Sequence, residues 1–162
     1  MKWIAGALLV IAGVPGLFAA DDNYTHLWLY NGHWKGTKKV GEAAPVAVDL
    51  VNECGRIGVF FGCQQTVDGK IGALVIYAPG EGAGHFYSQA IMPDGKAAGR
   101  GELTIDGDHW TYQSKYVDGD RTTWYKTTNV FTGKDHIRFE QAESSDGEHW
   151  VVKMSGEETR LK

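Results

Sequence analysis

The sequence contains few residues of the types that build metal, redox or cofactor sites, since it has two cysteines among 162 residues. It contains no closely spaced pair of cysteines or histidines, no calcium-binding loop and no glycine-rich nucleotide loop. The Gly-x-Ser-x-Gly pattern of many serine hydrolases is also missing. The sequence therefore predicts no catalytic residue, no metal ligand and no cofactor.

An excess of basic charge is also missing. Lysine and arginine number 16 against 20 acidic residues, which gives a net charge of −4, and the two signs are mixed along the chain. Nucleic acids and anionic membrane surfaces both attract proteins through a basic face. We therefore expect neither kind of partner.

The longest apolar run, residues 3–18, follows Lys2 and precedes Ala19 and Ala20. A basic start, an apolar stretch and small residues at its exit are typical of a secretory signal peptide. The run is shorter than the roughly 20 residues that cross a bilayer, so no membrane span is expected after cleavage. We predict a signal peptide at 1–20, one domain at 21–162, and a periplasmic or extracellular location.

Cys54 and Cys63 lie nine positions apart, and an oxidising compartment would allow them to pair. A loop at 55–62 would let a disulfide close its base. A tight turn at Gly55-Arg56 followed by an extended strand would hold the two sulfurs apart. The spacing therefore leaves both a disulfide and two buried thiols open.

Turn sequences recur regularly in the second half of the chain, where Asp-Gly pairs begin at positions 94, 106, 118 and 146. Asp-Gly suits the positive φ angles of two-residue hairpins. Between the turns, large apolar and polar residues alternate, as in residues 109–116, and this period of two indicates strands. A single helical turn is expected only near residues 23–30.

This pattern predicts an all-β domain. Strands are expected near 33–39, 45–52, 57–67, 70–78, 84–92, 98–105, 108–117, 121–131, 134–142 and 148–156. Ten strands in an open sheet would leave two unpaired edges, and closure of the sheet removes both. We therefore predict a single antiparallel up-and-down β-barrel.

The first predicted strand opens with Asn31-Gly32-His33-Trp34, which resembles the Gly-x-Trp motif of lipocalins. With the signal peptide and the meander, the chain resembles the calycin superfamily, including small secreted bacterial members. The resemblance implies that Trp34 closes one barrel end and that a basic residue, Arg138 or Arg160, covers its indole. The alternative is that Trp34 is an ordinary core aromatic.

A lipocalin-like barrel can hold a small, mainly apolar molecule, and aromatic side chains are the candidates for its wall. The predicted ligand-binding residues are Trp110, Tyr112, Trp124, Phe139, Trp150 and His85. The same rings could instead fill the barrel completely. His85 is also the residue we would test for binding a flat ligand such as haem. A three-histidine metal site at His85, His109 and His136 on one rim is a further hypothesis.

Two other functions stay open at this stage. The first is an enzyme of the same fold, in which His85, Glu102 or Arg100 at the barrel mouth carries out acid–base chemistry. The second is a protein-interaction or inhibitor module with a filled barrel, in which residues 54–63 contact the partner. Residues 58–62 form either an exposed apolar tip or a core strand, and the sequence leaves the oligomeric state open.

Overall fold

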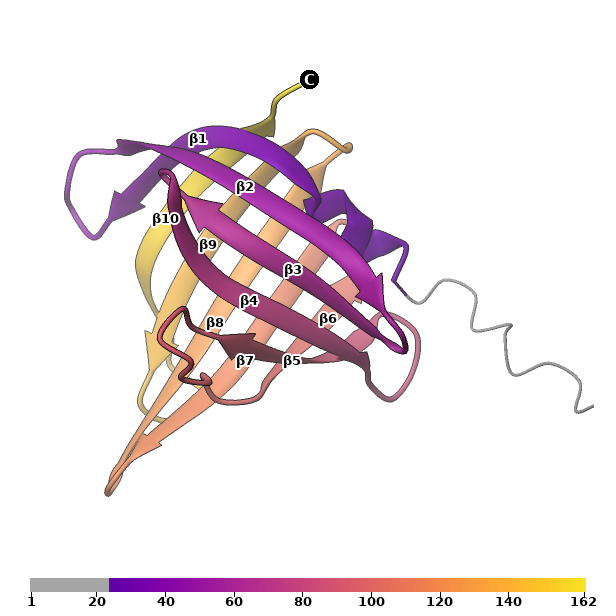
Figure 1. The fold of residues 1–162 in the computed structure, drawn as a ribbon. Coiled ribbons are helices and arrows are strands. Elements are labelled where there is room, and N and C mark those ends of the chain that lie inside the picture. Colours follow the sequence, from indigo (N-terminus) through magenta and orange to yellow (C-terminus); the bar gives the residue numbers. More distant parts are fainter. Residues whose placement is uncertain (1–23) are drawn as a thin grey trace, which may run out of the picture.

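The computed structural model describes residues 24–162 of the chain, so the predicted signal peptide lies outside the described residues. One helical turn is followed by strands only (Figure 1). The elements are η1 (His26–Tyr30), β1 (Gly32–Val40), β2 (Val46–Ile57), β3 (Phe60–Val67), β4 (Lys70–Pro79), β5 (His85–Ile91), β6 (Gly101–Asp106), β7 (His109–Asp118), β8 (Arg121–Thr132), β9 (His136–Ser144) and β10 (Val151–Arg160).

Each strand pairs antiparallel with the next one in the sequence, and β1 pairs with β10 to close the barrel. The closing seam runs from Trp34 opposite Arg160 to Val40 opposite Met154. The predicted all-β, up-and-down barrel of ten strands is therefore confirmed. Asp68-Gly69, between β3 and β4, has positive φ angles at both residues, 49° and 74°, as a two-residue hairpin requires. In the Asp-Gly pairs at 94, 106, 118 and 146, only the glycine has a positive φ.

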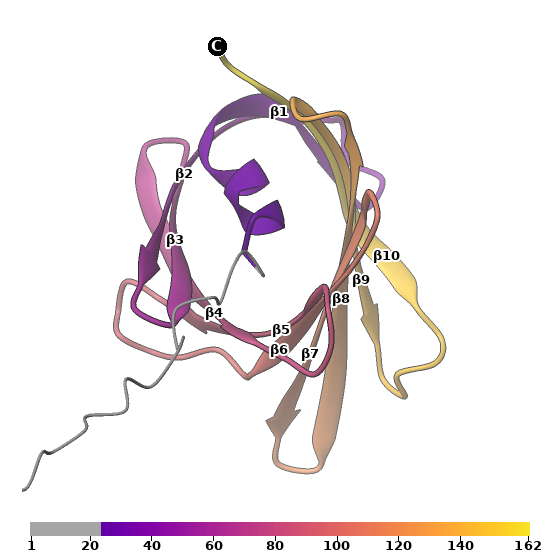
Figure 2. The ribbon, with the colours of Figure 1, turned by 90° about the vertical axis from the view of Figure 1, so that its right-hand side faces the viewer.

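The two ends of this barrel differ. One end carries η1, the C-terminus and the β2–β3, β4–β5, β6–β7 and β8–β9 hairpin turns, and we call it the closed end. Figure 2 shows η1 lying within the ring of strands there. The other five strand connections lie at the opposite end, which we call the open end. None of the helical structure between residues 24 and 162 has the length and apolarity to cross a lipid bilayer.

The hydrophobic core lies at the closed end. Trp110 packs against Phe131, with ring centroids 4.4 Å apart, and edge-on against Tyr30 at 4.9 Å. Fully buried Leu27 of η1 belongs to the same cluster. Because η1 covers these rings from the end of the barrel, the closed end is packed solid.

Trp34 is fully buried in this core, and its indole Nε1 donates to the carbonyl of Tyr30 at 3.0 Å. The guanidinium of Arg160 lies over its ring, 4.2 Å from the centroid. Arg160 also donates to the carbonyls of Leu29 and Asn31. Of the two arginines that the lipocalin resemblance left open, Arg160 is the one that covers Trp34.

The backbone conformation and the surroundings of position 32 require a glycine two residues before that tryptophan. The φ of Gly32 is +128°, which L side chains rarely adopt, and a Cβ there would lie 2.7 Å from the Arg160 guanidinium. A side chain would displace the arginine from Trp34. The Gly-x-Trp pair and the arginine thus form one structural unit.

Cys54 and Cys63 form a disulfide across β2 and β3. They occupy directly opposite positions of the two strands. Of the two pairings left open by the spacing, the disulfide is the one present, but neither a loop over 55–62 nor a turn at Gly55-Arg56 occurs. Strand β2 continues to Ile57 and β3 begins at Phe60. The turn between them lies at Gly58, whose φ of +61° suits glycine.

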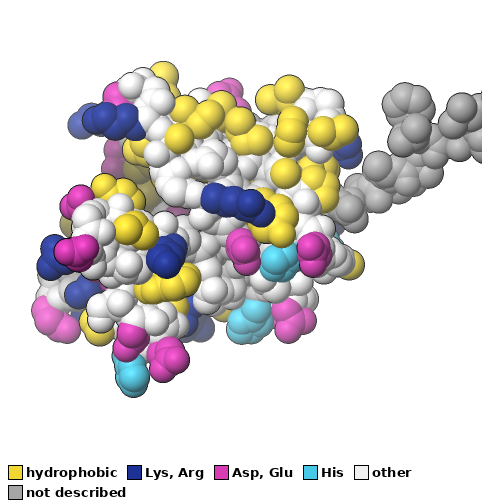
Figure 3. All heavy atoms as spheres, turned by 90° about the horizontal axis from the view of Figure 1, so that it is seen from below, with side chains coloured by type: hydrophobic (Ala, Val, Ile, Leu, Met, Phe, Trp, Pro, Cys, Tyr) yellow, Lys and Arg dark blue, Asp and Glu magenta, His cyan; other side chains and the backbone are white. Residues whose placement is uncertain are grey.

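The outer surface of the barrel has an uneven distribution of apolar groups. In the view of Figure 3, apolar side chains gather along the upper right, while acidic, basic and histidine side chains are mixed over the lower half. Residues 58–62 divide between the two roles expected of them. Val59 and Phe60 are 68% and 45% exposed at the hairpin tip, whereas Phe61 is fully buried in the closed-end core.

Candidate functional site

The open half of the barrel encloses a cavity of about 550 Å³, and inward-facing residues from all ten strands line it. The space exists because small side chains point inward there. On β7, Ser114 lines the cavity, whereas Trp110 fills the closed end. On β5, Ser88 and Ala90 line it, whereas Phe86 is buried in the core.

The wall of the cavity is partly apolar and partly polar. The larger aliphatic and phenyl side chains of the strands that line it are Val48, Leu50, Val67, Val75, Phe139 and Met154. Amide and hydroxyl side chains stand between them: Asn52, Gln65, Ser88, Ser114, Thr127 and Gln141. Such a lining suits a small molecule with an apolar body and a few hydrogen-bonding groups.

Three tyrosines and one asparagine form what we call the cavity floor, where the cavity meets the closed-end core. The hydroxyls of Tyr77 and Tyr112 lie 3.0 Å apart, and the amide Nδ2 of Asn129 donates to the hydroxyl of Tyr30 at 2.7 Å. All four residues line the cavity. The floor therefore presents a connected group of polar atoms below apolar walls.

Burial keeps these phenols protonated. It raises the pKa of Tyr77 to about 12, against a weaker opposing effect of its hydrogen bond with Tyr112. Burial also raises the pKa values of Tyr30 and Tyr112 well above their usual range, and the phenol of Tyr77 adds to both increases. At neutral pH the floor is thus a set of uncharged hydrogen-bonding groups.

Two lining residues carry charge, Glu158 of β10 and Lys38 of β1. Burial raises the pKa of the Glu158 carboxyl above its usual value. Glu158 lies opposite Gly36 and Lys38 lies opposite Gly156, so Lys38 is two residues nearer the open end, about 7 Å along the strand. No Lys, Arg or His nitrogen of residues 24–162 approaches the Glu158 carboxylate within 4.0 Å.

Of the predicted ligand-binding residues, Tyr112 and Phe139 line the cavity. Trp110 lies on the same face of β7 as Tyr112, but one step further into the closed end, where it is 1% exposed in the core. It therefore supports the floor from below. A ligand in the cavity would not touch it without rearrangement of Tyr30, which packs against its ring.

Trp124, Trp150 and His85 are not among the lining residues. Trp124 is one residue out of step with the lining residues of β8, so it faces outward, with Lys115 Nζ 5.2 Å from its ring centroid. Trp150 precedes β10 and is covered by Lys126 Nζ at 4.1 Å. His85 begins β5 at the closed end, one residue out of step with the inward-facing Phe86.

The residues considered for acid–base chemistry also lie outside the cavity. Glu102 is exposed on β6, and the Arg100 guanidinium stacks 3.7 Å from the ring centroid of Tyr87, a residue that faces away from the interior. Across residues 24–162, no group of three or more His, Cys, Asp or Glu side chains could hold a metal ion. The structure thus does not bring His85, His109 and His136 together.

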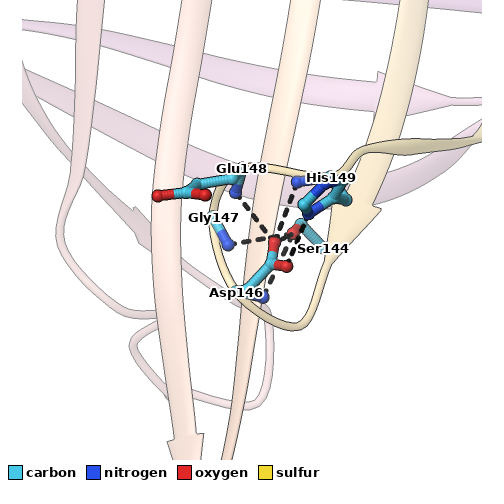
Figure 4. Close-up of polar contacts among 5 residues, drawn as sticks. All are labelled: Ser144, Asp146, Gly147, Glu148 and His149. Atoms are coloured by element: carbon cyan, nitrogen blue, oxygen red, sulfur yellow. Dashed lines mark hydrogen bonds and ion pairs between the residues drawn. The ribbon is translucent and has the colours of Figure 1, made fainter.

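A Ser-Asp-His cluster occurs at the open end, in the β9–β10 loop (Figure 4). Ser144 Oγ donates to one carboxylate oxygen of Asp146 at 2.8 Å, and His149 Nδ1 lies 2.8 Å from the other. Backbone N–H groups of His149 and Glu148 also point at Asp146 and help to hold its pKa well below the usual range. Because Asp146 stands between serine and histidine, the histidine does not activate the serine, and the cluster shapes the loop.

Sequence reasoning missed Tyr30, Asn129, Lys38 and Glu158. One signal could have found Glu158, because it continues the period-two series Met154, Gly156, Glu158 on β10. The predicted strand 148–156 ends before Glu158, and polar strand residues are expected on the wet outer face. In a barrel with a polar cavity, that assignment fails at the inner wall.

Comparisons with known proteins identify the fold. No protein-family model and no curated protein matches the sequence. Among solved structures, the chain is similar to Rv2717c from M. tuberculosis, with 14% identity, a TM-score of 0.55 and coverage of 86% of this chain and 98% of that one. It is also similar to the S-type phycobiliprotein lyase CPES from Guillardia theta, with 12% identity, a TM-score of 0.53 and coverage of 85% and 92%.

Proposed function

The chain folds as a lipocalin-like barrel of the calycin type, and we propose that it binds a small, mainly apolar molecule in its cavity. The observation that carries this proposal is the contrast between the solid closed end and the cavity of about 550 Å³ above it. That volume lies within the range of small-molecule sites. The molecule would lie against the apolar walls, with its polar group toward the floor.

We place this activity in the periplasm or outside the cell. The disulfide between Cys54 and Cys63 supports this location, because such bonds persist in oxidising compartments. The apolar N-terminal segment with its small-residue exit supports it as well. The likeness to a phycobiliprotein lyase concerns the fold at 12% identity, so no lyase activity is proposed.

The test is native mass spectrometry of the protein purified from its own host. We expect a mass above that of the polypeptide under native conditions, and loss of the excess on denaturation. Thr127→Trp, which fills the cavity, should abolish the excess. Thr128→Trp on the outer face of the same strand is the matched control and should retain it. A bare polypeptide mass for the unmodified protein would contradict the proposal.

The interaction module is favoured less by the structure. That function was expected to come with a barrel interior filled by side chains, and the open half of this barrel contains a cavity. One feature does support it, the exposed apolar tip of the β2–β3 hairpin at Val59 and Phe60. A bare native mass together with loss of partner binding in Val59→Ser would establish it in place of the ligand-binding function.

A further inference from the structure

Glu158 carries the inference, because its carboxylate lies inside the barrel without a countercharge. A buried carboxylate is ordinarily paired with a cation or with several donors, since transfer of an ion from water is unfavourable. In residues 24–162 no basic nitrogen comes within 4.0 Å of it, and no side-chain or turn hydrogen bond reaches its oxygens. The protein thus holds a negative group whose partner it does not itself supply.

The neighbouring floor is suited to a positive group. A carboxylate only accepts hydrogen bonds, so a ligand atom that faces it must donate. Glu158 lines the same cavity as the floor tyrosines Tyr30, Tyr77 and Tyr112. The hydroxyl oxygens of Tyr30, Tyr77 and Tyr112 can also accept hydrogen bonds from an ammonium group.

Lys38 gives the site a direction. Its amine also lines the cavity, but it lies two residues nearer the open end than Glu158. A positive ligand group is therefore repelled near the mouth and attracted near the floor. Between the two charges, Gly36 and Gly156 have no side chains, which lets β1 and β10 approach closely and lets the Phe139 ring lie against Gly156.

We propose that the ligand of this barrel is an amine, protonated at neutral pH, with an apolar or aromatic body. Its ammonium group binds Glu158 above the floor tyrosines, and its body contacts Phe139, Met154 and the valines of the wall. The inference rests on the proposed function, since it requires that the cavity binds a small molecule. It names the chemical class of that molecule.

The experiment compares three probes with the same ring system by isothermal titration calorimetry at pH 7: 1-naphthylmethylamine, 1-naphthylmethanol and 1-naphthoic acid. We expect the amine to bind about tenfold or more tightly than the alcohol, and the acid to bind more weakly than the alcohol, because a charge-assisted hydrogen bond exceeds a neutral one. Glu158→Gln should weaken the amine about tenfold and change the alcohol less than twofold. Glu157→Gln, which neutralises the exposed neighbouring carboxylate, should change neither.

The other outcomes separate the two proposals. If amine and alcohol bind alike, and Glu158→Gln changes neither, the amine class is wrong while the ligand-binding function stands. If no probe binds, yet the native mass excess is present and lost in Thr127→Trp, the amine class is again wrong and the cavity still binds a ligand. Absence of both probe binding and mass excess overturns the proposed function itself. Circular dichroism of each variant verifies that it has folded.

Discussion

The closed and open ends of the barrel are built from the same ten strands, yet only the closed end is filled. Trp110 and Ser114 lie on the same face of β7, four residues apart, and the first fills space that the second leaves empty. Phe131 and Thr127 repeat the difference on β8. The size of the inward side chains therefore changes along each strand, and this change rather than the strand number creates the cavity.

The comparison also separates stability from binding. The closed end contains the buried rings, η1 and the Trp34–Arg160 contact, so it contributes most of the apolar burial that stabilises the fold. The open end contains the cavity with its two charged side chains. Substitutions at one end should therefore mainly change the free energy of unfolding, and those at the other mainly ligand affinity.

The largest expected effect is at the closed end. Trp34→Ala should lower the free energy of unfolding by about 3–5 kcal/mol, the usual result of deleting a fully buried aromatic side chain. It also removes the surface on which Arg160 lies. Urea unfolding followed by circular dichroism measures the change. Phe139→Ala, at the half-buried cavity wall, is the comparison and should have a smaller effect. Equal losses would remove the distinction between the ends.

A smaller effect is expected from the disulfide near the junction of the two ends. Replacing Cys54 and Cys63 together by alanine should lower the free energy of unfolding by about 2–3 kcal/mol, because the nine-residue separation gives a short loop in the unfolded chain. Urea unfolding of the unmodified protein with and without dithiothreitol is the control. Dithiothreitol should lower the stability of the unmodified protein and leave the double variant unchanged, because the variant has no disulfide to reduce. A change in the double variant would show that dithiothreitol acts on something other than the disulfide.

The smallest effect, expected at the open end, depends on pH. Because burial raises the pKa of Glu158 above 4.5, the folded state binds its proton more tightly than the unfolded state. The contribution to stability is present below pH 4.5 and is lost as the pH rises through the raised pKa. Glu158→Gln should therefore gain stability relative to the unmodified protein between pH 4 and pH 7. The measurement is the urea midpoint of both proteins at pH 4 and pH 7. If the difference between their midpoints is the same at both pH values, the inward, desolvated position of Glu158 is contradicted.

The sequence predicted the fold well because local chemistry determines this topology. The Asp-Gly pairs at 68, 94 and 146 lie in connections between consecutive strands, and those at 106 and 118 begin with the last residue of a strand. Strand ends were less predictable, since β2 continues to Ile57 and β10 begins only at Val151. Neither end is marked by a residue that forbids extended backbone.

Prediction of the site was weaker for two physical reasons. Polar residues such as Thr127 and Asn129 face the interior, so the rule that places large apolar residues inside assigned Trp124 to the wrong side of β8. On β10, a β-bulge between Val152 and Met154 changes the alternation of faces. Val152 is therefore half exposed outside, while Met154 lines the cavity.

The seam between β1 and β10 has a consequence for biosynthesis. Every other strand pair joins neighbours in the sequence and can form as the chain is made. The seam joins the first strand to the last, so Trp34 meets Arg160 only after synthesis has passed β10. Until then β1 and β9 both present unpaired edges, to which strands of other chains can add. The nascent protein thus depends on the ten residues of β10 to become a closed, non-aggregating molecule.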